Sequence, residues 1–317
     1  MHLRSAHYRL ISVVVDAHNS EIYLQHTLTS LLSQTHTDLE IIIVDDGSTD
    51  GSPDIIRDFA ASDHRIHPIF TPHHGIAHAM NTGIAAASGD YIAYLDHDDI
   101  ALPVRLTNQL AWMQKNDLDI CGSCVKRIGD HSNLMWFPEK HKSICNELLF
   151  SCSLLQTGVM LRAEVAKQNP YDEQAIFLDY ELWTRLATRY RMGNIQQVLT
   201  LYRSHSRQTS LLMKAEFRED LRIYREPLFY KLFPDASADD YAALSRLIDN
   251  IPMGSLDELE HAGMLLSKLT QSGDAFLNDK MARRWWATCY RNAPLDVGCY
   301  QIYRNITPMF GSPTGNA

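Results

Sequence analysis

The 317-residue chain has ordinary globular composition, with 45% hydrophobic and 21% charged residues. Its formal net charge of −9 provides no overall basic field for nucleic acid, which we do not expect as a partner. No apolar run reaches the roughly 18 residues of a membrane span, and the start MHLRSAHYRL lacks the apolar core of a secretory signal. These features predict a cytoplasmic location, either free or peripheral at the inner face of the membrane.

Short apolar runs alternate with helix-periodic segments along the first 125 residues. Apolar composition predicts strands at residues 10–15, 40–44, 65–70, 91–95 and 118–121. Helix signals predict a helix capped by Ser20, a helix opened by Ser52-Pro53, and helices at residues 75–88 and 103–115. This alternation with short connections indicates an α/β fold with a mostly parallel, right-handed open sheet.

Two acidic clusters directly follow predicted strands. Asp45 and Asp46 end the second strand, and Asp96, Asp98 and Asp99 follow the fourth. Because ligands of open parallel sheets bind at the carboxyl ends of the strands, we expect both clusters at one crevice.

The alternation weakens beyond about residue 126. Residues 156–161 and 196–202 are predicted strands, with a helix at residues 178–189 between them. Residues 211–317 are predicted to form a helical appendage with breaks at Pro227, Pro234 and Pro252.

The six cysteines are spread too thinly to form a disulfide framework. Cys121-Gly-Ser-Cys124 has the spacing of a redox or zinc pair, but the sequence contains no second such pair. We expect inert core thiols.

Each acidic or histidine motif also has a purely structural interpretation. Asp96-His97-Asp98 could bind a hard divalent cation through its oxygens, or it could be a solvated acidic loop. The run DDGSTD could place Asp46 against a nucleobase N–H, or it could be only a turn. Asp179 could be a general base or an exposed acid near a helix start. By default His205 is a surface histidine.

Taken together and in order, these motifs resemble glycosyltransferase family 2, the inverting GT-A enzymes. The similarity includes ISVVVDAHN, LEIIIVDDGSTDGS, NTGIAAASGDYIAYLDHDD, QTGVMLR, LDYELW and YRSHSRQTS, and it covers residues 10–211. It implies a GT-A domain over residues 1–210, with a Rossmann-like, mostly parallel sheet flanked by helices. The nucleotide-sugar half would span about residues 10–125 and the acceptor half about residues 126–210. Residues 211–317 would form a helical C-terminal extension.

The resemblance also implies roles for individual residues. The implied nucleotide-binding residues are Asp16, His18, Asn19, Glu21, Asp46 and Asp96. Asp46 would hold the base N–H, whereas Asp96 would contact the ribose and the metal. Asp98 and His205 would complete the metal site, which would hold Mn²⁺ or Mg²⁺. Asp179 would deprotonate the acceptor hydroxyl.

Three segments depart from the family pattern. The family usually has Pro-x-Tyr-Asn after the first strand, where this chain has Asp16-Ala17-His18-Asn19. The ring of His18 could still stack on a base, and Asp16 adds a carboxylate near the base pocket. The usual Arg before Asn81 is Met80, and Leu178 replaces the Glu that precedes the base.

We therefore expect a metal-dependent inverting glycosyltransferase with a nucleotide-sugar donor, most compatible with UDP. The acceptor would be a hydroxyl of a glycan or lipid-linked saccharide in cell-surface polysaccharide synthesis. Trp136, Gly158 and Asp99 are candidates for the acceptor or sugar side. The run MARRWWATCYR in the C-terminal helices could contact a membrane surface or mediate self-association, or it could be a packed helix.

Two other functions remain open at this stage. A non-catalytic GT-A protein would bind nucleotide sugars without a base, but Asp179 is present. A sugar nucleotidyltransferase would carry a Gly-rich, basic loop after its first strand, whereas DAHNSE contains no Gly, Lys or Arg.

Overall fold

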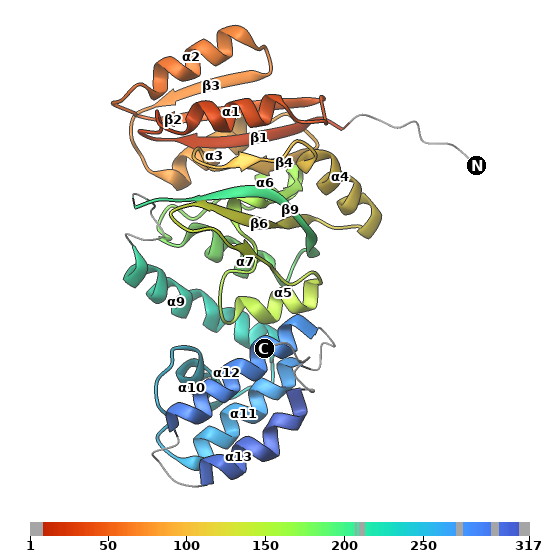
Figure 1. Ribbon diagram of the computed structural model, residues 1–317, viewed down its shortest axis with the longest axis vertical. Coiled ribbons are helices and arrows are strands. Elements are labelled where there is room, and N and C mark those ends of the chain that lie inside the picture. Colours follow the sequence, from red (N-terminus) through yellow and green to blue (C-terminus); the bar gives the residue numbers. More distant parts are fainter. Residues whose placement is uncertain (1–8, 207, 209–212, 271–274, 293–297, 311–317) are drawn as a thin grey trace, which may run out of the picture.

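One curled sheet runs through the upper two thirds of the molecule in Figure 1. The computed structural model describes residues 9–206, 208, 213–270, 275–292 and 298–310. Its strands are β1 Ile11–Ala17, β2 Leu39–Asp46, β3 Ile66–Thr71, β4 Tyr91–Tyr94, β5 Ile100–Ala101, β6 Ile120–Gly129, β7 Leu134–Met135, β8 Met160–Arg162 and β9 Met192–Ser204.

The strand order is β3-β2-β1-β4-β8-β6-β9-β5, and β7 pairs with β6. The first four strands of this order are parallel, as predicted. β8 then runs antiparallel to both β4 and β6, and β9 returns parallel to β6. The sheet is therefore mostly parallel, and its two halves meet at β4, where the DHDD run begins.

Helices cover both faces of the sheet. They are α1 Leu24–Leu32, α2 Ser52–Ser62, α3 Ile76–Ala86, α4 Arg105–Asn116, α5 His141–Leu148, α6 Ala163–Gln168 and α7 Leu178–Leu186, with the 3₁₀ turn η1 Gln156–Gly158. Alternate residues of β1 enter two separate cores: Val13 packs with α1 and α4, and Val14 with α3. Gly83 lets α3 approach closely, because a Cβ there would lie 2.5 Å from Val14 Cγ1.

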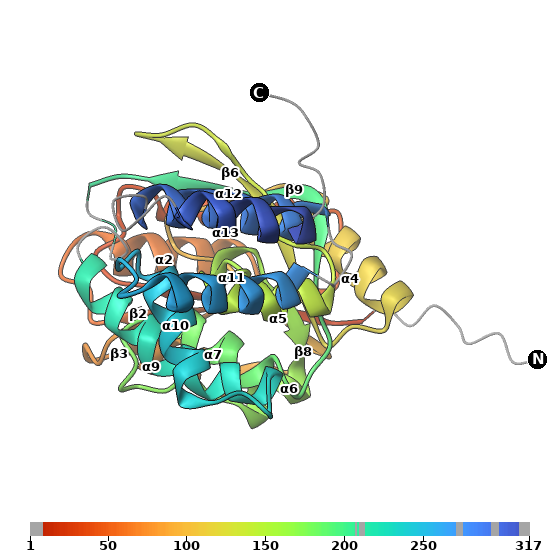
Figure 2. The same cartoon turned by 90° about the horizontal axis from the view of Figure 1, so that it is seen from below.

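The C-terminal helices gather at the end of the molecule opposite α2 and β3 (Figure 1). They are α9 Lys214–Leu232, α10 Ala238–Ile248, α11 Leu256–Thr270, α12 Ala275–Asn292 and α13 Gly298–Ile306, followed by the 3₁₀ turn η2 Thr307–Phe310. Figure 2 views the molecule from this end, where α11, α12 and α13 pack against one another. Trp183 of α7, Phe229 of α9 and Trp285 of α12 belong to one continuous core. A domain boundary at residue 210 stays a prediction.

Three local predictions are wrong. Ser20 does not cap α1, because residues 21–23 form a turn and the helix begins at Leu24. Residues 156–158 are a 3₁₀ turn, since the Gly158 and Val159 N–H groups bond to the preceding turn instead of a neighbouring strand. Pro227 does not break α9. The burial of Leu228 and Phe229 beside it offsets the roughly 3 kcal/mol that an internal proline costs.

All six cysteines are free, and Cys121 and Cys124 are buried as expected. Burial raises the pKa of Cys121 to about 12, so its thiol is unreactive at neutral pH. Among the described helices, none combines the length and apolar character needed to cross a bilayer.

The core between α7 and the C-terminal helices generates a stability prediction. Trp183 is 0% exposed, so Trp183→Ala should lower the free energy of unfolding by about 3–5 kcal/mol. Trp136 is 47% exposed, and Trp136→Ala should change it by less than about 0.5 kcal/mol. Chemical denaturation measures both variants. Equal losses for the two would contradict this assignment of the core.

Candidate active site

A cleft of about 310 Å³ opens at the carboxyl ends of β1 and β4. The far wall is formed by the loop before η1, the start of α7 and the residues that follow β9. The acidic and histidine side chains that line it are Asp16, Asp96, His97, Asp98, Asp179 and His205. The cleft therefore brings together residues that were predicted to bind the donor, to bind the metal and to act as the general base.

The three carboxylates of the DHDD turn lie together. One oxygen from each of Asp96, Asp98 and Asp99 lies within 4.8 Å of the others. Burial raises the pKa of Asp96 and of Asp99 well above the usual range, and the neighbouring carboxylates raise both further. A divalent cation would reverse this effect by favouring the ionised forms.

Asp99 lies beneath the cleft rather than on its surface. Its side chain is completely buried, and Oδ1 accepts the Arg203 N–H at 2.7 Å. Asp96 and Asp98 remain as the members of the triad that line the cleft. In this position Asp99 anchors the end of β9 to the DHDD turn.

A buried arginine that was not predicted as a site residue lies under this turn. Arg105, at the start of α4, is 0% exposed and donates to the carbonyls of Tyr94 at 2.6 Å and Val159 at 3.2 Å. Burial lowers the pKa of Arg105 to about 10, against the opposing charges of Asp99 and Asp96. The guanidinium therefore stays protonated at neutral pH and offsets part of the triad's negative charge.

The end of β9 brings His205 to the triad. His205 Nε2 lies 2.8 Å from Asp98 Oδ2, although 107 residues separate the two in sequence. Arg203 Nε donates to the Asp98 carbonyl at 2.8 Å, and its guanidinium lies over the Tyr23 ring at 4.5 Å. These contacts hold the end of β9 against the DHDD turn. The side chains of Asp98 and His205 therefore lie next to each other at the cleft.

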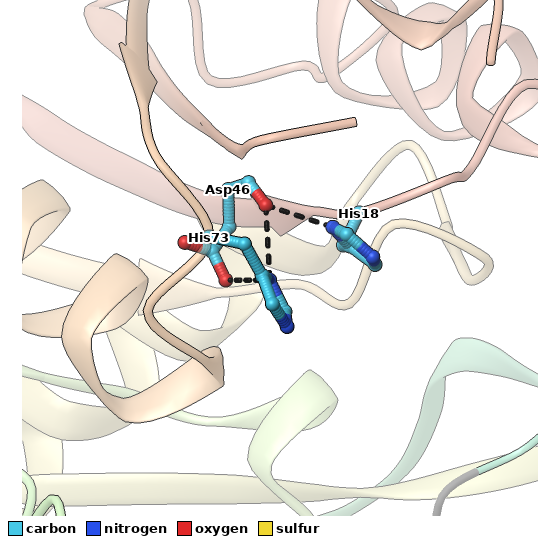
Figure 3. A group of neighbouring side chains, drawn as sticks. All are labelled: His18, Asp46 and His73. Atoms are coloured by element: carbon cyan, nitrogen blue, oxygen red, sulfur yellow. Dashed lines mark hydrogen bonds and ion pairs between the residues drawn. The ribbon is translucent and has the colours of Figure 1, made fainter. Parts of the chain in front are cut away.

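Asp46 is buried at the end of β2 beside the loop that precedes α3. Its carboxylate accepts the His74 N–H at 2.8 Å and the Gly75 N–H at 2.7 Å, and His73 Nδ1 lies 2.9 Å from Oδ2 (Figure 3). Burial alone would raise the pKa of Asp46, but these N–H groups and His73 lower it overall. The exposed ring of His73 covers the carboxylate.

His18 stacks on His73, with ring centroids 4.3 Å apart. His18 Nδ1 lies 2.7 Å from the Asp46 carbonyl, which can only accept, so this nitrogen carries the proton. Nε2 in turn accepts from the Asn19 amide at 3.0 Å, and Asn19 Oδ1 accepts the Thr49 N–H. The nitrogen that faces Asp46 therefore offers no lone pair to a metal ion. The two rings lie stacked against each other (Figure 3).

Asp16 and Glu21, both predicted to bind the nucleotide, differ in their position relative to the cleft. Asp16 lines the cleft, and burial raises the pKa of its carboxyl although His97 opposes the shift. Glu21 Oε2 accepts the Gly51 N–H at 2.8 Å and so anchors the start of α2. It is not among the residues that line the cleft.

Asp179 faces the cleft from the start of α7. Its Oδ1 accepts the Tyr180 N–H at 2.8 Å, and the Cys152 thiol lies 3.6 Å from Oδ2. Burial raises the pKa of Asp179 to about 6, the range of a general base that works near neutral pH. Trp136 is exposed and Gly158 is buried, and neither lines the cleft.

The family assignment rests on comparison with known proteins. The sequence model described as Glycosyl transferase family 2 matches residues 12–173. The chain belongs to this family. It is 30% identical over 245 residues to a Haemophilus influenzae protein named as an uncharacterized glycosyltransferase, covering 70% of this chain and 74% of that one. It is 28% identical over 209 residues to the Escherichia coli O-antigen biosynthesis glycosyltransferase WbnJ. This match covers 63% of this chain and 82% of WbnJ.

Solved structures confirm the GT-A fold of this family 2 glycosyltransferase. S. aureus TarS 1–349 superimposes with a TM-score of 0.58 at 16% identity, covering 95% of this chain and 90% of that one. The mannosyltransferase PcManGT of Pyrobaculum calidifontis, solved with GDP-Man and Mn²⁺, superimposes with a TM-score of 0.55 at 19% identity. This match covers 95% of this chain and 83% of PcManGT. Both matches extend over the C-terminal helices.

Proposed function

We propose that this glycosyltransferase is metal-dependent and inverting, and that it moves a sugar from a nucleoside diphosphate to an acceptor hydroxyl. One observation carries the proposal. Asp96 and Asp98 line the same cleft as His205 and Asp179, and these residues come from different elements. This arrangement supports a cation with its diphosphate beside a base for the acceptor.

The donor set suits a hard divalent cation, Mn²⁺ or Mg²⁺. Asp96 and Asp98 offer carboxylate oxygens at the cleft, and His205 Nε2 offers an imidazole nitrogen beside Asp98. When bound, the cation would neutralise the diphosphate and stabilise it as the leaving group. Its charge would also relieve the repulsion that raises the pKa of Asp96 and Asp99.

We assign the general base to Asp179. With a pKa of about 6, the carboxylate is ionised near neutral pH and basic enough to take a proton from an attacking hydroxyl. Attack by that hydroxyl on the anomeric carbon, opposite the leaving diphosphate, is a single displacement and inverts the configuration. An α-linked donor would give a β-linked product.

We propose a UDP-sugar donor, with dTDP next, because a carboxylate at Asp46 can accept the N3–H of uracil or thymine. His73 Nδ1 lies 2.9 Å from Asp46 Oδ2. The His73 ring would therefore have to move before a nucleobase could reach this oxygen. His18 would supply the stacking surface. The structural neighbours named with donors differ: TarS was solved with UDP-GlcNAc and PcManGT with GDP-Man.

We propose a glycan or lipid-linked saccharide as the acceptor, in line with the O-antigen biosynthesis named for WbnJ. The exposed Trp286 and Tyr290 rings of α12 stack at 5.4 Å. They support a surface for membrane contact or self-association at the C-terminal helices.

Asp179→Asn should reduce sugar transfer by roughly 10²–10⁴-fold, because the amide cannot accept the acceptor proton. UDP binding should stay close to wild type, as Asp179 is not expected to contact the nucleotide. Transfer assays and calorimetry measure the two effects, with the exposed Asp172→Asn as the matched control. Transfer within a few-fold of wild type would remove Asp179 from catalysis and favour a non-catalytic role for the carboxylate.

Calorimetry with UDP, dTDP, GDP and CMP in the presence of Mn²⁺ tests the nucleobase. UDP should bind most tightly, because uracil presents an N–H to the Asp46 carboxylate. Asp46→Asn should weaken UDP binding by about tenfold or more, since it removes a charged acceptor. Tight GDP or CMP binding together with no UDP binding would show that the role given to Asp46 is wrong.

His205→Ala should raise the Mn²⁺ concentration needed for half-maximal activity, because it removes one ligand from the far side of the cleft. Asp98→Ala should do so more severely, since the lost ligand is charged. His26→Ala, an exposed histidine of α1, is the control. Metal titrations of activity compare the four proteins, and superimposable curves for wild type and His205→Ala would exclude the histidine from the site.

A further inference from the structure

Cys152 differs from the other cysteines of the chain. It lies between α5 and η1, lines the cleft and is partly exposed, whereas the other five are buried. Its Sγ lies 3.6 Å from Asp179 Oδ2 and 3.0 Å from the Leu154 carbonyl. A thiol has one proton, so it can donate to only one of these oxygens at a time.

The thiol is protonated and therefore a donor. Burial raises the pKa of Cys152 well above its usual range, and the charge of Asp179 raises it further. The S–H is the only side-chain donor that contacts Asp179 Oδ2 among the residues that the structure describes. Oδ1 accepts the Tyr180 N–H, and the backbone N–H of Gln156 also donates to the carboxylate.

Other titratable groups near Asp179 do not donate to this oxygen. Tyr171 is buried, and the charge of Asp179 is one of the causes that raise the pKa of its hydroxyl. Asp96, Asp98 and His205 line the same cleft. These three residues are unchanged in all variants at Cys152.

We propose that Cys152 is a positioning residue that holds the Asp179 carboxylate ionised and oriented by donating its S–H to Oδ2. This rests on the proposed function, in which Asp179 is the base. When Oδ2 takes the proton of the acceptor hydroxyl, the thiol keeps its own proton and turns to the Leu154 carbonyl. Cys152 thus supports the charged base and releases Oδ2 once the proton has moved.

The pH dependence of kcat separates this role from a packing role. Activity of the wild type should fall as pH drops through about 6, where Asp179 becomes protonated. Cys152→Ala removes the donor, which disfavours the charged form and should move this acid limb about half a pH unit higher. Cys152→Ser restores a donor and should return the limb to the wild-type position or below it. Profiles are measured at saturating metal and normalised to their alkaline plateaus.

If the acid limb of the pH profile of kcat lies at the same pH in wild type and Cys152→Ala, the proposal is overturned. So does an equal shift in Cys152→Ala and Cys152→Ser, because a packing defect would not distinguish a side chain with a donor from one without.

Alkylation of Cys152 by iodoacetamide tests the contact without any activity. Asp179→Asn removes the charge that opposes thiolate formation, so labelling at pH 8, followed by peptide mass spectrometry, should become at least about threefold faster. Asp172→Asn, which neutralises an exposed acid elsewhere, should label at the wild-type rate. Equal rates in wild type and an inactive Asp179→Asn overturn the proposal alone. Retained transfer by Asp179→Asn overturns the proposed base and, with it, the role of Cys152.

Discussion

The crowding of buried carboxylates at the end of β4 is the constraint on which the rest of the site depends. Asp96, Asp98 and Asp99 lie within reach of one another, and burial together with the charge of Asp98 raises the pKa of Asp96 and of Asp99. Such a cluster needs positive charge close by. The protein supplies part of it from below through Arg105, and we propose that a cation supplies the remainder from the cleft.

The order of the strands in the GT-A sheet brings the polar side chains of the site to one edge. β1, β2 and β4 are parallel, so their polar ends meet at the same edge. The long β9 then crosses from the second half of the sheet and is fastened to the DHDD turn through Asp99 and Arg203. This fastening sets His205 beside Asp98.

Much of this arrangement could be predicted from the sequence, because apolar strand runs and the positions of acids after them are local signals. The parallel half of the sheet and the placement of Asp46 and the triad at its edge follow from such signals. The approach of His205 to Asp98 could not be read from periodicity, since it depends on a pairing across 107 residues. It came from the family resemblance.

Arg105 and His73 show why the rest could not be predicted. An arginine beside Leu106 on an amphipathic helix is normally solvated, and only the packing of β4 against η1 makes its burial favourable through two carbonyl acceptors. His73 acquires its position from the Asp46 carboxylate and from stacking on His18, contacts that leave no periodic pattern in the run TPHHG. His73 contacts Asp46, and Arg105 lies under the turn that carries Asp96, Asp98 and Asp99.

Anomalous diffraction at the manganese edge, from crystals grown with Mn²⁺ and UDP, tests most directly whether a cation neutralises the triad. We predict one strong peak in contact with Asp98 Oδ2 and His205 Nε2, with density for the diphosphate beside it. A peak at His18, Asp46 and His73, or no peak near Asp98 while UDP is bound, would contradict the assignment.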